Sequence, residues 1–190
     1  APTQSGAVWL NNGTLTIGSA SGGGVSLHSS NSLSGYYPTI SGGIGNNVSG
    51  TYSVVSGGAT NSVTDSNAST ITGGLYNCIA VGWVNTISGG SYNTVFGGQN
   101  TISGGYCNTT SGGYANTISS SYNSKIYGQS SCSTISSGYH STINASQVST
   151  ISGGYCNHIT NSQNSNITGG HQNTSTDVNQ TSISGGYRND

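Results

Sequence analysis

Residues 85–119 read NTISGGSYNTVFGGQNTISGGYCNTTSGGYANTIS, and the phrase Asn-Thr-Ile-Ser-Gly-Gly returns about every eight residues. A repeat of fixed period is typical of solenoids and related arrays, in which each unit packs only against its neighbours. The repeat therefore has to be interpreted before any local secondary-structure pattern. It predicts a chain that winds into stacked coils.

A single aliphatic residue marks each repeat, and these residues continue along most of the chain. Neighbouring ones are mostly seven, eight or nine positions apart, and the positions at Thr110 and near Ser175 lack an aliphatic side chain. They are Ile40, Val48, Val55, Val63, Ile71, Ile79, Ile87, Val95, Ile102, Ile118, Ile126, Ile135, Ile143, Ile151, Ile159, Ile167 and Ile183. This pattern predicts a narrow core with one aliphatic side chain per repeat.

The repeats also alternate, because every second phrase is nearly constant while the phrases between them vary. Thr86-Ile87-Ser88 is a constant phrase, and Thr94-Val95-Phe96 is a variable one. A half-unit of about eight residues within a full unit of about sixteen predicts a coil with two sides. The expected fold is all-β: a two-sided β-solenoid, of the β-roll or β-helix kind, with about ten coils.

The solenoid array is expected to occupy residues 39–190. Residues 1–38 do not follow the period, and we predict that they form an N-terminal cap over the open edge and core of the first coil. Short strands are expected at residues 8–10 and 15–17, with Trp9 as a lid.

The inward-facing polar residues should hold the corners of the coils together. Neighbouring side chains of a strand point to opposite faces, so an inward aliphatic residue places the residue two positions before it inward as well. That residue is almost always Asn or Ser, as at Asn77, Asn93 and Ser133. We expect these side chains to bond backbone groups that no strand partner reaches.

The Gly-Gly pairs are expected to turn the chain, since glycine tolerates the positive φ that such corners need. Tyrosines follow the glycines of the constant phrases, and their rings should stack along one edge of the solenoid. These tyrosines are Tyr106, Tyr122, Tyr139, Tyr155 and Tyr187.

Composition excludes several functional classes. The chain is 31% hydrophobic and 3% charged, too little apolar material for an ordinary globular core but enough for a narrow solenoid. Lys125 and Arg188 are its only basic residues, so we expect no binding to nucleic-acid phosphates. No apolar run is long enough for a membrane-spanning helix. The chain begins at Ala1 and contains no methionine, and we expect a processed, extracellular product.

The chain also lacks the residues on which catalysis and metal binding depend. Its acids are Asp65, Asp177 and Asp190, with no glutamate. The half-unit GG-x-x-N-x-I-x resembles the calcium-binding nonapeptide of the RTX β-roll, but Asn or Ser stands at the ligand position in place of Asp. We therefore expect no enzyme activity, no metal and no cofactor.

The four cysteines do not form an obvious disulfide framework. Cys107 and Cys156 hold the same place in the repeat but lie three coils apart, which is about 14 Å at ~4.8 Å per coil and beyond disulfide reach. We expect no bond between them.

The outward residues of the constant phrases form two uncharged rows. The first row, before the aliphatic residue, contains Thr39, Thr70, Thr86, Thr101, Thr117, Thr134 and Thr150. The second row, after it, contains Ser41, Ser56, Thr72, Ser88, Ser103, Ser119, Ser136, Ser152, Thr168 and Ser184. A solenoid needs its inward residues to repeat, but it does not need one outer face to repeat while the other varies. The constant face is therefore the candidate site, and it suits a periodic, uncharged ligand.

The phrase Thr-Ile-Ser-Gly-Gly-x-x-Asn-Thr-Val resembles the repeat of grass antifreeze and ice-recrystallisation-inhibition proteins. The Thr-x-Ser/Thr rows are similar to the Thr-x-Thr arrays of insect β-solenoid antifreeze proteins. This resemblance covers residues 39–190 and implies a secreted protein with a flat ice-binding face. The residues implied are Thr39, Ser41, Thr70, Thr72, Thr86, Ser88, Thr101, Ser103, Thr117, Ser119, Thr134, Ser136, Thr150, Ser152 and Thr168. The chain differs from these families in its frequent serine at the second position and in a slightly longer coil.

The phrase Gly-Gly-Tyr-Cys-Asn-Thr-Thr-Ser-Gly-Gly-Tyr also resembles the β-roll repeats of trimeric surface adhesins and viral fibre proteins. That resemblance implies a homotrimer or a host-surface receptor as partner, with the constant face as a subunit interface or a plain surface. A structural spacer without a ligand is a third interpretation. A monomer favours ice binding, and a stable trimer favours the fibre.

Overall fold

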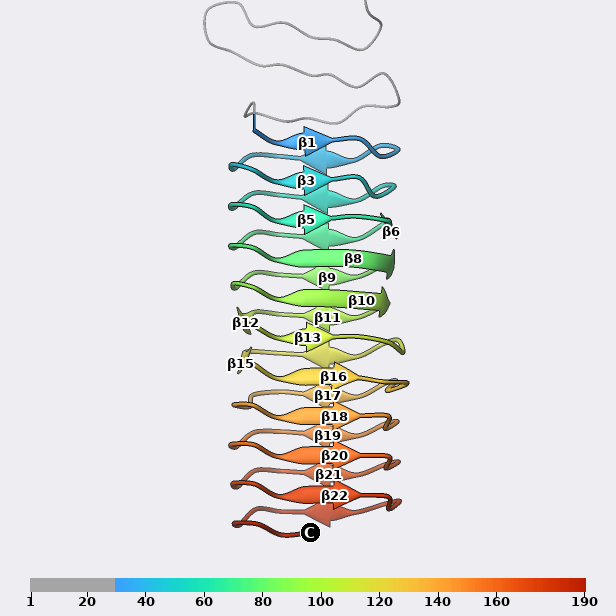
Figure 1. The fold of residues 1–190 in the computed structure, drawn as a ribbon, viewed down its shortest axis with the longest axis vertical. Coiled ribbons are helices and arrows are strands. Elements are labelled where there is room, and N and C mark those ends of the chain that lie inside the picture. The colour runs from blue at the N-terminus through green and yellow to red at the C-terminus, as the bar shows by residue number, and fades with distance from the viewer. Residues whose placement is uncertain (1–29) are drawn as a thin grey trace, which may run out of the picture.

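The computed structural model of the protein describes residues 30–190, which form one elongated stack of coils (Figure 1). This part of the chain consists of short strands and turns, without a helix. All strand pairs are parallel, as expected when one chain winds repeatedly in the same direction.

Two long sheets run along the stack, and successive coils contribute a strand to each. The first, which we call the threonine sheet, contains β2 (Thr39–Ile40), β4 (Val54–Val55), β7 (Thr70–Ile71), β9 (Thr86–Ile87), β11 (Thr101–Ile102), β14 (Thr117–Ile118), β17 (Thr134–Ile135), β19 (Thr150–Ile151), β21 (Asn166–Ile167) and β23 (Ser182–Ile183). It is therefore a 10-stranded sheet, which matches the expected number of coils.

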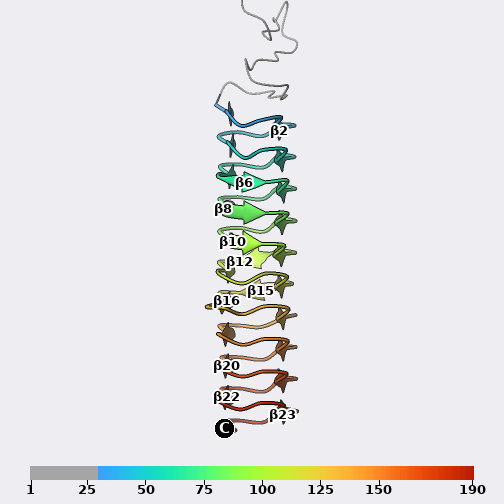
Figure 2. The same ribbon diagram turned by 90° about the vertical axis from the view of Figure 1, so that its right-hand side faces the viewer.

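The second sheet, which we call the variable sheet, lies on the opposite side of the coil (Figure 2). It contains β1 (Ser32–Leu33), β3 (Asn47–Val48), β5 (Ser62–Val63), β8 (Cys78–Trp83), β10 (Thr94–Gly98), β13 (Thr109–Thr110), β16 (Lys125–Tyr127), β18 (Thr142–Asn144), β20 (His158–Thr160) and β22 (Thr174–Thr176), with β6 (Ser66–Asn67) beside β8. A third, small sheet pairs β12 (Gly105–Tyr106) with β15 (Ser121–Tyr122). These sheets confirm the predicted all-β, two-sided solenoid.

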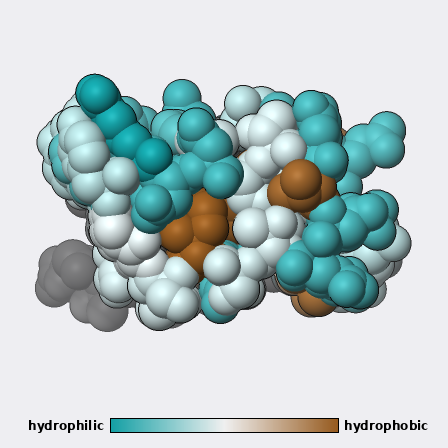
Figure 3. All heavy atoms as spheres, turned by 90° about the horizontal axis from the view of Figure 1, so that it is seen from below, coloured by the Kyte–Doolittle hydropathy of each residue, from teal (hydrophilic) through white to brown (hydrophobic). Residues whose placement is uncertain are grey.

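The core consists of one aliphatic side chain from most strands of the two long sheets, with Thr110 of β13 and Ser175 of β22 at equivalent positions. The side chains with no exposed surface are Ile40, Val48, Val55, Val63, Ile71, Ile79, Ile87, Val95, Ile102, Ile118, Ile126, Ile135, Ile143, Ile151, Ile159 and Ile167. At the C-terminal end Ile183 packs on this cluster but is only partly buried, and the end-on view shows hydrophobic atoms within an otherwise polar surface (Figure 3). The prediction of inward-stacked isoleucines is confirmed.

The array starts before residue 39, because Ser32 and Leu33 pair in register with Asn47 and Val48. The expected boundary between cap and array therefore falls inside the first coil. The strands expected at residues 8–10 and 15–17, and the Trp9 lid, lie outside the described residues.

Inward-facing asparagines form ladders that join each coil to the next. Asn93 makes four hydrogen bonds: its N–H donates to Asn77 Oδ1 (3.0 Å), its Oδ1 accepts from the Asn108 N–H (3.0 Å), and its Nδ2 donates to the carbonyls of Gly89 and Gly105 (3.1 Å each). Both donors and the oxygen of this buried side-chain amide, and the backbone N–H, thus have partners. The predicted role of these residues at the corners is confirmed.

Serine continues the ladders where asparagine is absent. The Ser133 N–H donates to Asn116 Oδ1 (3.1 Å), and the Ser149 N–H donates to Ser133 Oγ (3.3 Å). A hydroxyl is shorter than an amide and has one donor, so it satisfies fewer backbone groups per coil. The ladders are therefore richest in bonds where asparagines follow one another.

Two kinds of residue turn the chain at each corner. The second glycine of the pair has a positive φ, as at Gly90 (80°), which confirms the expected role of the Gly-Gly phrases. The residue just before the inward Asn or Ser is also left-handed, although it is rarely glycine, as at Tyr92 (57°) and Val148 (51°). A β-branched residue such as Val148 is strained in this conformation, which the sequence pattern did not predict.

The two corners of the coil differ in regularity. From an aliphatic residue of the threonine sheet to the next one of the variable sheet the chain always takes eight residues, as from Ile40 to Val48. We call this the constant corner. The chain returns from the variable sheet to the threonine sheet through the other corner, which we call the irregular corner. This path takes seven, eight or nine residues, for example seven from Val95 to Ile102. All variation in coil length therefore falls at one corner.

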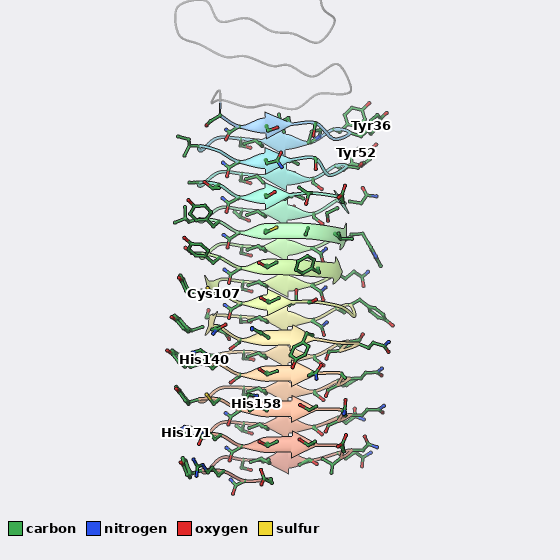
Figure 4. The ribbon with its side chains drawn as sticks, in the orientation of Figure 1. Tyr36, Tyr52, Cys107, His140, His158 and His171 are labelled. Carbon is green, nitrogen blue, oxygen red and sulfur yellow. The ribbon has the colours of Figure 1, made fainter. Side chains whose placement is uncertain are left out.

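The tyrosines stack at the constant corner, as predicted. Tyr106, Tyr122, Tyr139 and Tyr155 follow one another with ring centroids 4.7–5.3 Å apart and nearly parallel planes. His171 and then Tyr187 continue the column through edge-to-face contacts. We call this column the tyrosine edge; His171 is labelled beside it in Figure 4.

The four cysteines are free thiols. Cys107 and Cys156 lie in the same column three coils apart, with Asn123 and His140 between them, because Tyr106, Tyr122, Tyr139 and Tyr155 pair in sequence. The expectation that these two cysteines are not bonded is confirmed.

We expect Asn93→Ala to lower the free energy of unfolding by roughly 3 kcal/mol, because one buried N–H and two glycine carbonyls lose a partner. Chemical denaturation measures this change. Asn47→Ala is the control: Asn47 is a half-buried, outward residue of β3, and this change should cost at most about 0.5 kcal/mol. Equal effects of the two substitutions would contradict a stabilising role for the ladder.

We expect Thr110→Val to stabilise the protein. Thr110 occupies an aliphatic position of the core with no exposed surface, and its hydroxyl has no hydrogen-bond partner. Valine keeps the shape and removes the unsatisfied group, which should add about 1 kcal/mol to the free energy of unfolding. The outward neighbour gives the control, Thr109→Val, for which little change is expected. A lower denaturation midpoint for Thr110→Val would show that this hydroxyl has a partner.

Candidate functional site

The candidate site is the outer surface of the threonine sheet. The first row is the outward residue at the start of each strand, and the second row is the residue that follows the inward aliphatic. Thr101 pairs in register with Thr86 on one side and Thr117 on the other. The structure thus brings the predicted first-row threonines into one line, although they are 15 to 17 residues apart in sequence.

Backbone hydrogen bonds hold both rows in place. In the first row, the Thr101 N–H donates to the Asn116 carbonyl of the next coil (2.8 Å). In the second row, the Ser103 N–H donates to the Ile118 carbonyl (2.9 Å). Every coil repeats this pattern, so the side chains above it are presented by a backbone that is fixed on both sides.

The first row is not threonine throughout. Val54 interrupts it between Thr39 and Thr70, and Asn166 and then Ser182 occupy its C-terminal end. The uninterrupted threonine surface therefore extends from Thr70 to Thr150. Sequence reasoning omitted the interrupting residues because it followed the threonines alone.

None of the hydroxyl groups in the two rows donates or accepts a hydrogen bond within the described protein. The first-row threonines are half-buried, and the second-row residues are half-buried or exposed, as Ser103 is. Neither row contains a charged residue. This face therefore offers water a regular array of unpaired hydroxyls and methyl groups.

The outer face of the variable sheet has no comparable regularity. Its first row includes Cys78, Lys125 and His158; Figure 4 labels His158. Burial lowers the pKa of the His158 imidazole and raises the pKa of the Cys78 thiol, so both groups are neutral at pH 7. Lys125 is exposed and carries a positive charge in this row.

A cluster of exposed apolar side chains lies where the variable sheet meets the irregular corner. A β-bulge between β8 and β10 places Val81 opposite Phe96. Trp83 lies over Gly98, where a Cβ would come within 2.6 Å of its Nε1 atom. These three side chains are exposed. We call Val81, Trp83 and Phe96 the apolar cluster. Bulges commonly re-aim side chains at functional sites, and exposed apolar groups mark interaction sites.

Sequence reasoning missed this cluster. The signal was present in the spacing, because an eight-residue irregular corner after Ile79 is followed by a seven-residue one after Val95. Two corners of unequal length cannot pair throughout, and the bulge absorbs the extra residue.

The described residues hold no group of three His, Cys, Asp or Glu side chains that could bind a metal ion. Among them, no helix is long and apolar enough to cross a membrane.

The described chain is a two-sided β-solenoid with one regular, uncharged face. No protein-family model matches it, and no curated protein is similar to it in sequence.

Proposed function

We propose that the protein binds ice through the outer face of the threonine sheet. The observation that carries this proposal is the in-register line of threonines whose hydroxyls have no partner among residues 30–190. Polar side chains of a folded protein usually bond to backbone, water or other side chains. A long row of hydroxyls that all bond only to solvent can order that solvent along a line.

The spacing of the array suits a crystalline ligand. Successive threonines lie about one strand separation apart, ~4.8 Å, and the two rows on a strand are about two residues apart, ~6.7 Å. The backbone ladder fixes these spacings before binding, so little conformational entropy is lost on contact with a rigid surface. Threonine adds a methyl group for apolar contact, a hydroxyl for hydrogen bonding and a β-branched side chain with few rotamers.

The absence of charged residues from the two rows is consistent with ice as the ligand. A charged side chain holds its own hydration shell, which has to be removed or distorted at a crystal surface, and that costs free energy. Both rows are free of charge, whereas the variable sheet carries Lys125. The proposal places the protein outside the cell.

We expect a double substitution, Thr101→Lys with Thr117→Lys, to abolish most of the thermal hysteresis and ice-recrystallisation inhibition. The two lysines would lie on adjacent strands, β11 and β14, in the middle of the row, where they interrupt the flat surface and add charge. The matched control is Thr94→Lys with Thr109→Lys. These residues pair in the same way on β10 and β13 of the variable sheet and are half-buried to a similar degree.

The control should keep its activity, and both variants should keep the β-sheet circular dichroism spectrum of the parent. Loss of activity in both variants, or in neither, would contradict the assignment to the threonine sheet. A parent protein without ice activity at high concentration would exclude ice binding altogether.

The apolar cluster favours a second candidate function, a segment of a fibre or adhesin that docks to another surface. Exposed apolar groups next to a bulge are typical of interaction sites, and the ice-binding proposal does not use them. This function predicts a homotrimer or a bound host-surface receptor. Size-exclusion chromatography with light scattering distinguishes the two candidate functions, since a monomer supports ice binding and a stable trimer supports the fibre.

A further inference from the structure

The tyrosine edge contains a closely matched pair of phenol rings. Tyr122 and Tyr139 have ring centroids 4.7 Å apart and planes that differ by 3°. The flanking contacts are longer and less parallel: 5.3 Å and 17° from Tyr106 to Tyr122, and 5.0 Å and 10° from Tyr139 to Tyr155. The central pair therefore has the shortest and most parallel contact of the three.

Backbone hydrogen bonds hold this pair in register. The Tyr122 N–H donates to the Gly138 carbonyl (2.9 Å), and the Tyr139 N–H donates to the Gly154 carbonyl (3.0 Å). The constant corner always has the same length, so no bulge can move one ring past the other. The two side chains start from adjacent, parallel positions on neighbouring coils.

Both rings are accessible to reagents. Tyr122 is 42% exposed and Tyr139 is 40% exposed, and neither phenol hydroxyl makes a hydrogen bond to the described protein. Their stacked faces are covered by neighbouring rings, so the ring edges and hydroxyls meet the solvent. The carbons next to the hydroxyl carry much of the spin density of a phenoxyl radical.

We propose that Tyr122 and Tyr139 are a site of oxidative coupling to dityrosine by a peroxidase-type oxidant. Each phenol loses one electron and one proton, and the two phenoxyl radicals form one carbon–carbon bond between the positions next to their hydroxyls. The remaining hydrogens on those carbons shift to restore both phenols. Hydrogen peroxide takes up the two electrons and two protons and is reduced to two waters. The product joins one coil covalently to the next.

Thiols at the flanking tyrosines direct coupling to the central pair. Tyr106 and Tyr155 are each followed by a free cysteine, Cys107 and Cys156, whose thiols are partly exposed beside the tyrosine edge. A thiol that donates a hydrogen atom to a nearby phenoxyl radical returns it to phenol and becomes a thiyl radical itself. Tyr122 and Tyr139 are followed by Asn123 and His140 and have no such neighbour.

The cross-link would stabilise the solenoid in the way that a disulfide does. It restricts the unfolded chain between residues 122 and 139, and it requires the two stacked rings to rotate about their side-chain bonds, because the new carbon–carbon bond lies in the plane of both rings. The thermal unfolding temperature should therefore rise. This inference does not depend on ice binding, since the tyrosine edge lies at the constant corner and outside the two rows of the threonine sheet.

The test uses the full chain at low concentration with a haem peroxidase and hydrogen peroxide. Dityrosine fluorescence should appear in the monomer, and mass spectrometry of a digest should show peptides of Tyr122 and Tyr139 joined with the loss of two hydrogens. Tyr139→Phe keeps the stacked ring but cannot form the radical, so the link between the peptides of residues 122 and 139 should disappear. Tyr127→Phe, which changes a tyrosine of the variable sheet, should leave the signal intact.

A link that maps to another pair, fluorescence found only in covalent dimers, or an unchanged signal in Tyr139→Phe would overturn the proposal. Absence of any coupling would overturn it as well. The double variant Cys107→Ser with Cys156→Ser tests the role of the thiols. New links at Tyr106 and Tyr155 support that role, and an unchanged link pattern would contradict it.

Discussion

The structure depends on the hydrogen bonds of the inward asparagine and serine ladders. A coil with one aliphatic side chain per strand buries too little apolar surface to order its corners, where the backbone pairs with neighbouring coils mostly through isolated bridges. Asn93 shows how the ladder solves this, since its side chain and N–H bond three neighbouring segments, including the coils before and after it. Without these bonds, buried polar groups at every corner would lack partners, which is costly in a thin core.

The same ladders make a regular surface possible. They fix each coil on the next, so residues at equivalent positions fall into lines along the stack. The outward residues are then free to vary without disturbing the core, as they do on the variable sheet. In the first row of the threonine sheet they do not vary from Thr70 to Thr150, which is why this face carries the proposal of ice binding. At the constant corner the same alignment places Tyr122 on Tyr139.

Much of the fold could be predicted because the period of the repeat determines which residues point inward. Ile87 and Ile102 follow from spacing alone, and Asn93 follows from its place two residues before Val95. The left-handed conformation of Val148 could not be predicted, because a β-branched residue disfavours it and the corner imposes it. The bulge that exposes Val81 beside Phe96 was also missed, since it arises from the pairing of two corners of unequal length.

The sequence by itself determined the two-level period, the inward and outward positions and the uncharged character of one face, because strand geometry makes side chains alternate. Tertiary structure decided what no single repeat contains. It placed Thr101 between Thr86 and Thr117, left their hydroxyls without partners in the described part of the chain and confined every change of coil length there to one corner. The physical reason is that parallel pairing joins residues about sixteen positions apart, so alignment depends on how each corner closes and on which coil lies beside it.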